Sequence, residues 1–281
     1  MIFQFIQPSL HLKDFVREYL LFHVKVKPGT VLPLKHYHAT PEEGMTFYLK
    51  GFLLCSQAKN GIIEKRAQSV IFGPSIERQN LQLPEEYLMF FVRLQPGMLH
   101  LLLRLPMSEL VQKNIDAEVI LGKEVRQLHE QMANATSYDQ ILKMVEDFLW
   151  NKFQNFSINP HLSLLVPKLI LENPEIFNLD KMASLACLSH RQFERTFLRH
   201  IGLTPKLFAR LCRFSRANEL KERHPNKDWF SIAIETGYND YQHLVKDFKA
   251  FDGATPKTLM TENAQSPERW LKLALHSDKT Q

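Results

Sequence analysis

The stretch "SHRQFERTFLRHIGLTP" at residues 189–205 is followed 51 residues later by "DYQHLVKDFKAFDGATP" at residues 240–256. The two stretches align without a gap, and each ends in a glycine, one variable residue and Thr-Pro. A second match, at an offset of 50, pairs residues 179–183 with residues 229–233. We therefore predict a tandem repeat in which a short helix, a turn and a second helix form the outline of a helix-turn-helix.

The second helix of each copy has two distinct faces. At about 100° per residue, apolar side chains four residues apart lie on one face and the intervening polar side chains lie opposite. The inward positions are Phe193, Phe197, Leu244 and Phe248, and the outward positions are Arg191, Arg195, Gln242 and Lys246. Arginine and glutamine can each make two hydrogen bonds to a base edge in the major groove of DNA. A basic outer face is also what an ordinary solvated helix presents, so one helix alone would not distinguish the two interpretations.

The segment between the two copies, "TPKLFARLCRFSRANELKER", has the pattern of a single helix. A helix of about 18 residues is roughly 27 Å long. That length could hold two recognition helices near the separation of about 34 Å between successive major grooves on one side of a duplex. The repeat therefore predicts that one chain contacts two adjacent half-sites on DNA.

The ends of the helices carry recognisable signals. Gly202 and Gly253 suit the left-handed position that ends a helix, and Pro205 and Pro256 suit the first turn of the next one. Because a helix N-terminus attracts anions, Thr204, Lys206 and Lys257 are candidate contacts to DNA phosphates. The alternative is that these residues only cap or solvate the helix ends.

The composition of the 281 residues gives broader limits. The length suggests two domains. The formal charge of +5 is concentrated beyond residue 159, where 18 basic side chains face 14 acidic ones. No apolar run reaches the 18 residues of a membrane span, and the N-terminus lacks the pattern of a signal peptide, so we expect a soluble, cytoplasmic chain. The widely spaced Cys55, Cys187 and Cys212 predict free, buried thiols rather than disulfides or a zinc site.

The first 95 residues predict a mostly antiparallel sheet or barrel. Runs rich in β-branched and aromatic residues at 45–56, 68–73 and 87–94 are separated by Gly and Pro turn signals. Helical periodicity begins after Pro96, and the segments 123–132 and 137–153 predict a helical hairpin. The polar segment "QNFSINPH" at residues 154–161 is the candidate boundary, after which the pattern is entirely helical.

The C-terminal part resembles the DNA-binding domain of the AraC/XylS family of bacterial transcription regulators. The resemblance rests on Ile232-Ala233, Gly237-Tyr238, His243, Phe248-Lys249, Gly253 and Thr255-Pro256. The chain departs from the family pattern at Leu244, at Cys187 and at Leu259. By position, the resemblance implies that bases are contacted by Arg191, Glu194 and Arg195 in the first unit and by Tyr241, Gln242 and Lys246 in the second.

The N-terminal part resembles the cupin-like sensing domain of some members of that family. This resemblance implies a domain that binds a small-molecule effector or a protein partner and is followed by helices that form a homodimer. The expected fold class is α+β, with a mostly β, cupin-like barrel and trailing helices before an all-α double helix-turn-helix domain. The expected domains are residues 1–157 and 158–262, with a C-terminal tail at 263–281.

A cupin-like metal site is one alternative that the sequence raises. His36, His38 and Glu42 have the spacing of the first metal-binding motif of cupins, and two histidines two residues apart on a strand point to one side. The second motif should add a histidine, but Arg78 stands in the matching region. We therefore expect no metal and no other cofactor, with the histidines hydrogen-bonded to neighbours or solvated.

The sequence as a whole predicts a sequence-specific transcriptional regulator that binds double-stranded DNA and is controlled by its N-terminal sensor. It contains no phosphate-binding loop, dinucleotide glycine motif, HExxH or GxSxG, so we propose no catalytic residues and no enzyme activity. The resemblance also allows RNA polymerase as a further partner. We expect no interaction with a membrane. A metal-dependent cupin enzyme and a protein-binding adaptor without DNA contacts are the alternatives.

Overall fold

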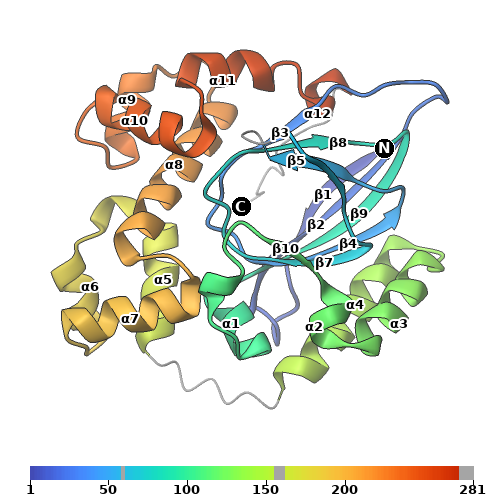
Figure 1. Ribbon diagram of the computed structural model, residues 1–281, viewed down its shortest axis with the longest axis horizontal. Helices are drawn as coiled ribbons and strands as arrows, with labels where there is room; N and C mark the ends of the chain where they lie inside the picture. Colours follow the sequence, from blue (N-terminus) through green and yellow to red (C-terminus); the bar gives the residue numbers. More distant parts are fainter. Residues whose placement is uncertain (58–60, 155–161, 272–281) are drawn as a thin grey trace.

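The computed structural model describes residues 1–57, 61–154 and 162–271. An N-terminal region of antiparallel strands with four helices precedes a helical C-terminal region, which confirms the predicted α+β class (Figure 1). The predicted boundary segment lies outside the described residues from position 155 onward. None of the helices in the described ranges has the length and apolar character needed to cross a membrane.

The strands are β1 (Ile2–Ile6), β2 (Val16–Lys25), β3 (Lys35–Tyr37), β4 (Gly44–Lys50), β5 (Leu54–Gln57), β6 (Ile63–Lys65), β7 (Ser69–Phe72), β8 (Gln79–Gln82), β9 (Glu86–Leu94) and β10 (Asn114–Asp116). The helices of the N-terminal region are α1 (Met98–Leu103), the short 3₁₀ helix η1 (Met107–Glu109), α2 (Ala117–Leu121), α3 (Lys123–Ala133) and α4 (Tyr138–Phe153). The helices of the C-terminal region are α5 (Leu162–Glu172), the 3₁₀ helix η2 (Pro174–Ile176), α6 (Leu179–Leu185), α7 (His190–Ile201), α8 (Pro205–Arg223), α9 (Trp229–Glu235), α10 (Tyr241–Asp252), α11 (Pro256–Asn263) and α12 (Pro267–Trp270).

The strands form two antiparallel sheets. Six strands pair in the order β1-β2-β9-β4-β7-β10, and four pair in the order β3-β8-β5-β6. Residues 45–56, which the sequence predicted as one strand, are divided between the two sheets at Gly51. There φ is +72°, and an added Cβ would lie 2.4 Å from the carbonyl oxygen of Glu86, so only glycine fits. Strands β1, β2, β3, β6, β8 and β10 were not predicted.

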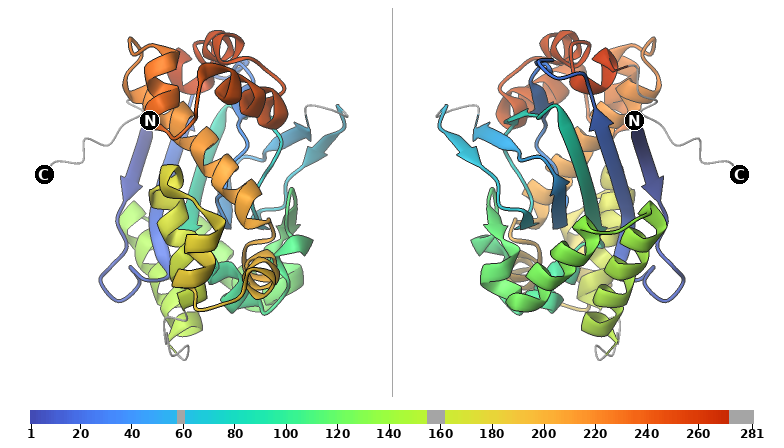
Figure 2. Two further views of the ribbon diagram at one scale, coloured as in Figure 1. Left: turned by 90° about the vertical axis from the view of Figure 1, so that its left-hand side faces the viewer. Right: turned by 90° about the vertical axis from the view of Figure 1, so that its right-hand side faces the viewer.

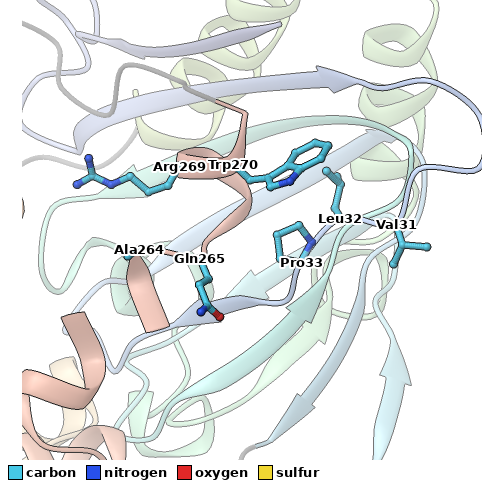
Figure 3. A pocket seen from close by; sticks show the side chains of 7 residues that line it. All are labelled: Val31, Leu32, Pro33, Ala264, Gln265, Arg269 and Trp270. Atoms are coloured by element: carbon cyan, nitrogen blue, oxygen red, sulfur yellow. The ribbon is translucent and has the colours of Figure 1, made fainter. Parts of the chain in front are cut away.

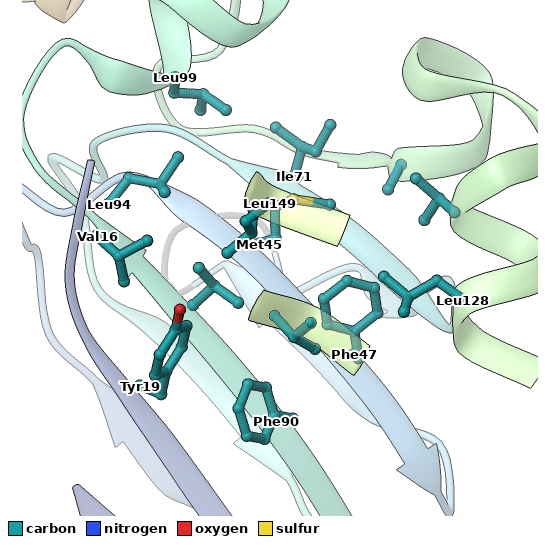
Figure 4. Close-up of a cluster of buried hydrophobic side chains, with 14 of the residues drawn as sticks. Val16, Tyr19, Met45, Phe47, Ile71, Phe90, Leu94, Leu99, Leu128 and Leu149 are labelled. Atoms are coloured by element: carbon teal, nitrogen blue, oxygen red, sulfur yellow. The ribbon is translucent and has the colours of Figure 1, made fainter. Parts of the chain in front are cut away.

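Helices cover one face of the six-stranded sheet and bury its largest apolar cluster. Side chains of the sheet such as Phe47 and Phe90 pack with Leu128 of α3 and Leu149 of α4 (Figure 4). Helices α3 and α4 therefore form the predicted hairpin. A second cluster, which includes Phe22 and Leu81, joins strands of the six-stranded sheet to strands of the four-stranded sheet.

The C-terminal region contains the predicted repeat. Helices α7 and α10 each have 12 residues and begin 51 positions apart, whereas α6 and α9 each have 7 residues and begin 50 apart. Gly202 and Gly253 end α7 and α10 at φ of 83° and 71°, and Pro205 and Pro256 begin the next helices. The prediction of two successive helix-turn-helix units is confirmed.

The prediction that all three cysteines are buried is wrong for Cys187. Cys55 and Cys212 are buried, but Cys187 is exposed because it lies in the turn between α6 and α7. Its φ is +55°, and the matching turn of the second unit has Gly237 at +81°. A cysteine in this left-handed region carries a conformational cost of about 1 kcal/mol or more, which the glycine of the second unit avoids.

Replacing Cys187 with glycine should therefore stabilise the protein. We expect Cys187→Gly to raise the free energy of unfolding by about 1 kcal/mol, measured by denaturant titration. Cys187→Ala is the matched control, because it also removes the thiol but keeps the strained backbone. Equal stability of the glycine and alanine variants would contradict the assignment of strain to this turn.

Candidate nucleic-acid interface

Helices α7 and α10 are the candidate recognition helices of the two units, and each has one buried face and one exposed face. Phe193, Phe197, Leu244 and Phe248 are each at most 2% exposed. The opposite side chains, Arg191, Arg195, Gln242 and Lys246, are all exposed. The orientation inferred from the spacing is therefore correct for both helices, and α8 lies between the two units (Figure 1).

The remaining predicted base contacts differ in exposure. Glu194 is exposed on the same helix as the two arginines. Tyr241 is half-buried, because its ring packs against the core of the C-terminal region. The structure thus brings three predicted side chains to the surface of α7, whereas α10 presents Gln242 and Lys246 beside a partly covered Tyr241. The contact of all six with bases stays a prediction.

Several basic side chains on these surfaces have no acidic partner within the described part of the C-terminal region. Within residues 162–271, Arg191, Arg195 and Lys246 form no ion pair. The same holds for the exposed Lys206 and Lys257 near the starts of α8 and α11. A cation without an internal partner can neutralise a phosphate without first losing a bond inside the protein.

Several polar residues cap the N-termini of the helices in these units. Ser189 and Gln192 form a reciprocal capping box at the start of α7. The Thr204 hydroxyl accepts a hydrogen bond from the backbone N–H of Leu207 at 3.3 Å and caps α8. Capping is therefore a role that Thr204 has in the folded protein. Phosphate contacts by Thr204, Lys206 and Lys257 stay predictions.

An internal ion pair that the sequence analysis missed anchors α10 to α8. The guanidinium of Arg210 donates two hydrogen bonds, at 3.1 and 2.6 Å, to one carboxylate oxygen of Asp247, whose side chain is buried. The same guanidinium lies 5.5 Å from the ring centre of Phe251. A charged pair of this kind is orientation-dependent, so it helps to set the angle at which α10 leaves α8. Its only sequence signal is an aspartate next to the inward-facing Phe248.

The candidate metal ligands have other partners. The Nδ1 atom of His36 is 2.7 Å from Oδ1 of Asn80, and Glu42 forms an ion pair with Arg93 at 2.9 Å. His38 bonds with Asp252 at 2.9 Å and with Asn263 at 3.1 Å. Across the described ranges of the chain, no three His, Cys, Asp or Glu residues are grouped so that they could hold a metal ion.

The partners of His38 show that the N-terminal region contacts the second helix-turn-helix unit. Asp252 ends α10 and Asn263 ends α11, and both bond to a residue that follows β3. Arg78 forms an ion pair with Glu262, and its backbone N–H bonds to the carbonyl of Phe251 at 3.1 Å. We call these contacts, together with the ion pair between Lys35 and the buried Glu268, the β3–α11 contact.

The N-terminal region also contacts the first unit. The rings of His100 on α1 and His200 on α7 are stacked with centres 4.5 Å apart. At Gly202 an added Cβ would lie 2.6 Å from the carbonyl oxygen of Met107, so η1 approaches the end of α7 as closely as a glycine permits. Both recognition helices are therefore held at their C-terminal ends, which leaves their N-terminal halves exposed.

A pocket opens beside the β3–α11 contact. Its volume is about 510 Å³, and Leu32, Pro33 and Trp270 form apolar walls, with Gln265 at the side (Figure 3). Arg269 extends away from Trp270 and Leu32 (Figure 3). With Val31 84% exposed and Trp270 54% exposed, the pocket is a shallow surface feature.

Comparison with known proteins agrees with this geometry. Residues 182–262, which contain most of both units, match the family described as "Helix-turn-helix domain". The C-terminal region of the chain is therefore similar to AraC-type helix-turn-helix domains. Residues 4–116 match a separate family described as "Domain of unknown function (DUF6597)", which contains nearly all the strands.

Curated relatives of the AraC-type domain are transcriptional regulators. The chain is 32% identical over 88 residues to an HTH-type transcriptional regulator of Haemophilus influenzae, covering 31% of this chain and 29% of that protein. It is 28% identical over 104 residues to the HTH-type transcriptional regulator MtrA of Neisseria gonorrhoeae, covering 37% and 34%. The matches thus span about a third of the length of these relatives.

A solved structure with similarity over a longer range is that of ToxT from Vibrio cholerae O395. The alignment covers 89% of this chain and 98% of the ToxT chain, with 11% sequence identity and a TM-score of 0.47.

Proposed function

We propose that this protein is a sequence-specific DNA-binding transcriptional regulator that contacts two adjacent major-groove half-sites and is controlled by its N-terminal region. The observation that carries the proposal is the repeat of one device. The capped helices α7 and α10 begin 51 residues apart, and α8 connects their units. Both expose hydrogen-bonding side chains that have no partner within the described part of the protein. A solvated surface alone does not require two such faces in matching positions.

Specificity and affinity come from different side chains in this proposal. Arg191, Arg195, Gln242 and Lys246, with Glu194 and Tyr241 beside them, contact base edges. Thr204, Lys206 and Lys257 contact phosphates, which adds affinity that depends on salt but not on base sequence. The differences between copies, above all Arg191 against Gln242, give the two half-sites different preferred bases.

Regulation and location complete the proposal. The β3–α11 contact and the α1–α7 stack connect the N-terminal region to both DNA-binding units, so an effector or partner that alters this region would alter their relative orientation. We place the protein in the cytoplasm, without enzyme activity and with RNA polymerase as a further partner. The activity would then be regulation of transcription at sites defined by the two half-sites.

The proposal includes a homodimer formed through the α3–α4 hairpin. The inner sides of both helices are buried in the main core, so deleting the hairpin would disrupt folding. A dimer must therefore use the outer side, where Trp150 is 38% exposed. Sedimentation of the full chain and of Trp150→Glu tests this. The wild type should sediment as a dimer and the variant as a monomer. A monomeric wild type would contradict the proposed homodimer.

Substitutions on the two recognition helices should alter different halves of the binding site. We expect selection from a random DNA library to return two half-sites. Arg191→Ala should reduce discrimination at one base of the first half-site by about 1–3 kcal/mol, and Gln242→Ala should do so in the second. Quantitative binding to duplexes that carry single base changes measures both effects.

Lys206→Ala is the matched control for those variants. As a phosphate contact it should weaken binding to all sequences about equally and reduce the slope of log affinity against log salt by about one. If the Arg191 and Gln242 variants behaved like the Lys206 variant, their assignment as base contacts would be refuted. If the wild type bound no duplex at all, the adaptor function would be favoured.

Breaking the β3–α11 contact should release the second unit alone. Glu262→Lys opposes Arg78 with a like charge, so we expect amide exchange in α10 and α11 to accelerate at least about tenfold while α6 and α7 keep their protection. Affinity for a duplex with both half-sites should change, but affinity for the first half-site alone should not. Glu235→Lys, an exposed charge reversal on α9, is the control, and an equal effect there would contradict a role for the contact.

A further inference from the structure

A polar pocket lies on the N-terminal region, far along the chain from the DNA-binding helices. Its volume is about 360 Å³, and it is formed by the end of β4, the start of β7, the β10–α2 junction and one side of α3. Leu49, Val125 and Ala133 supply apolar wall, and the polar lining comes mainly from Ser69, His129 and charged residues. The volume falls within the range of about 300–1,000 Å³ that is typical of small-molecule sites.

Two polar side chains that line the pocket are buried, and each has an atom without a hydrogen-bond partner among the described residues. His129 is 7% exposed and Ser69 is 6% exposed. Neither the Nε2 atom of His129 nor the hydroxyl oxygen of Ser69 has a partner in the described part of the chain. A buried polar atom without a partner is unfavourable, and two of them beside one pocket indicate that a bound molecule supplies the missing bonds.

The charged residues of the lining indicate the sign of the charge that a bound molecule carries. Three carboxylates line the pocket, those of Asp116, Glu118 and Glu130, against one guanidinium, that of Arg126. Arg126 already pairs with Glu118 at 3.0 Å. Glu130 forms no ion pair within the described ranges. Burial lowers the pKa of His129, which favours the neutral imidazole. The pocket therefore offers acceptors and net negative charge.

We propose that this pocket binds a small primary amine. An ammonium group carries three N–H donors and no acceptor. The pocket provides an imidazole nitrogen, a hydroxyl oxygen and an unpaired carboxylate that can each accept one of them. Since a water molecule occupies about 30 Å³ of liquid, the volume admits a ligand of about ten non-hydrogen atoms. The aliphatic part of the amine lies against Leu49 and Val125.

The bound amine would join elements that are separate in the sequence. Ser69 begins β7, whereas His129 and Glu130 are on the first helix of the hairpin, so one ligand contacts both the sheet and α3. This assigns a chemical class to the effector of the proposed regulator and in that sense rests on the proposed function. Binding of the amine is nevertheless measured without DNA, so the two proposals fail independently.

The test is calorimetric titration of the full chain with butylamine, butan-1-ol and butyrate, which share a carbon chain and differ in charge. Butylamine should bind, and the alcohol and the carboxylate should bind at least about tenfold more weakly. Glu130→Gln should weaken butylamine binding about tenfold by removing the unpaired charge. Glu124→Gln, the same change on α3 outside the pocket, should leave it within twofold.

Ser69→Ala provides a second variant that tests the buried acceptor, with thermal melting to show that it folds. It should also weaken butylamine binding. Equal binding of the three probes, or equal binding by the wild type and Glu130→Gln, would overturn the proposal. Loss of binding in Glu124→Gln to the same extent as in Glu130→Gln would also overturn it, because the effect would then reflect general charge.

Discussion

The packing of both recognition helices on α8 is the constraint on which the rest of the C-terminal region depends. The ring of Phe197 lies 5.5 Å from that of Phe208, and the ring of Phe248 lies 4.8 Å from that of Phe214. Phe208 and Phe214 are six residues apart on one helix, hence about 9 Å apart along its axis and about 120° apart around it. The two units therefore leave α8 in different directions, and a rigid helix fixes both the distance and the angle between them.

The N-terminal region adds a second constraint, because it reaches both ends of this arrangement. On one side η1 approaches Gly202 at the end of α7, and on the other His38 and Arg78 contact the end of α10 and α11. Both sets of contacts fall at helix C-termini, away from the exposed N-terminal halves. Asp252 is 2% exposed, so separation of the regions would expose a buried carboxylate together with apolar surface such as that of Ala39. Their relative position is thus well defined by contacts that do not cover the candidate DNA-binding face.

The sequence predicted what depends on local periodicity and missed what depends on distant partners. The repeat, its caps and the outward arginines follow from helical spacing, and the structure has them where the spacing places them. Strands β3 and β8 were missed because they are three and four residues long and lack alternation. His38 has the spacing of a metal ligand, yet its partner Asp252 lies 214 residues away, and no local pattern reveals that. Asp247 was missed for the same reason, since only the fold places Arg210 beside it.

The polar pocket and the contacts to the second helix-turn-helix unit lie at the two ends of one short segment of the chain. Ser69, at the start of β7, lines the pocket, and nine residues further along the chain Arg78 contacts α10 and α11. Between them, Gln112 accepts hydrogen bonds from the backbone N–H groups of Ile76 and Glu77 and so holds the connecting loop against the turn between η1 and β10. A ligand that displaced β7 would move one end of this segment, whose other end is fixed to the second helix-turn-helix unit. Coupling by this route needs the loop to have two arrangements of similar energy. The first unit, which meets η1 and α1 instead, would respond differently, so a single ligand could change the angle between the two recognition helices.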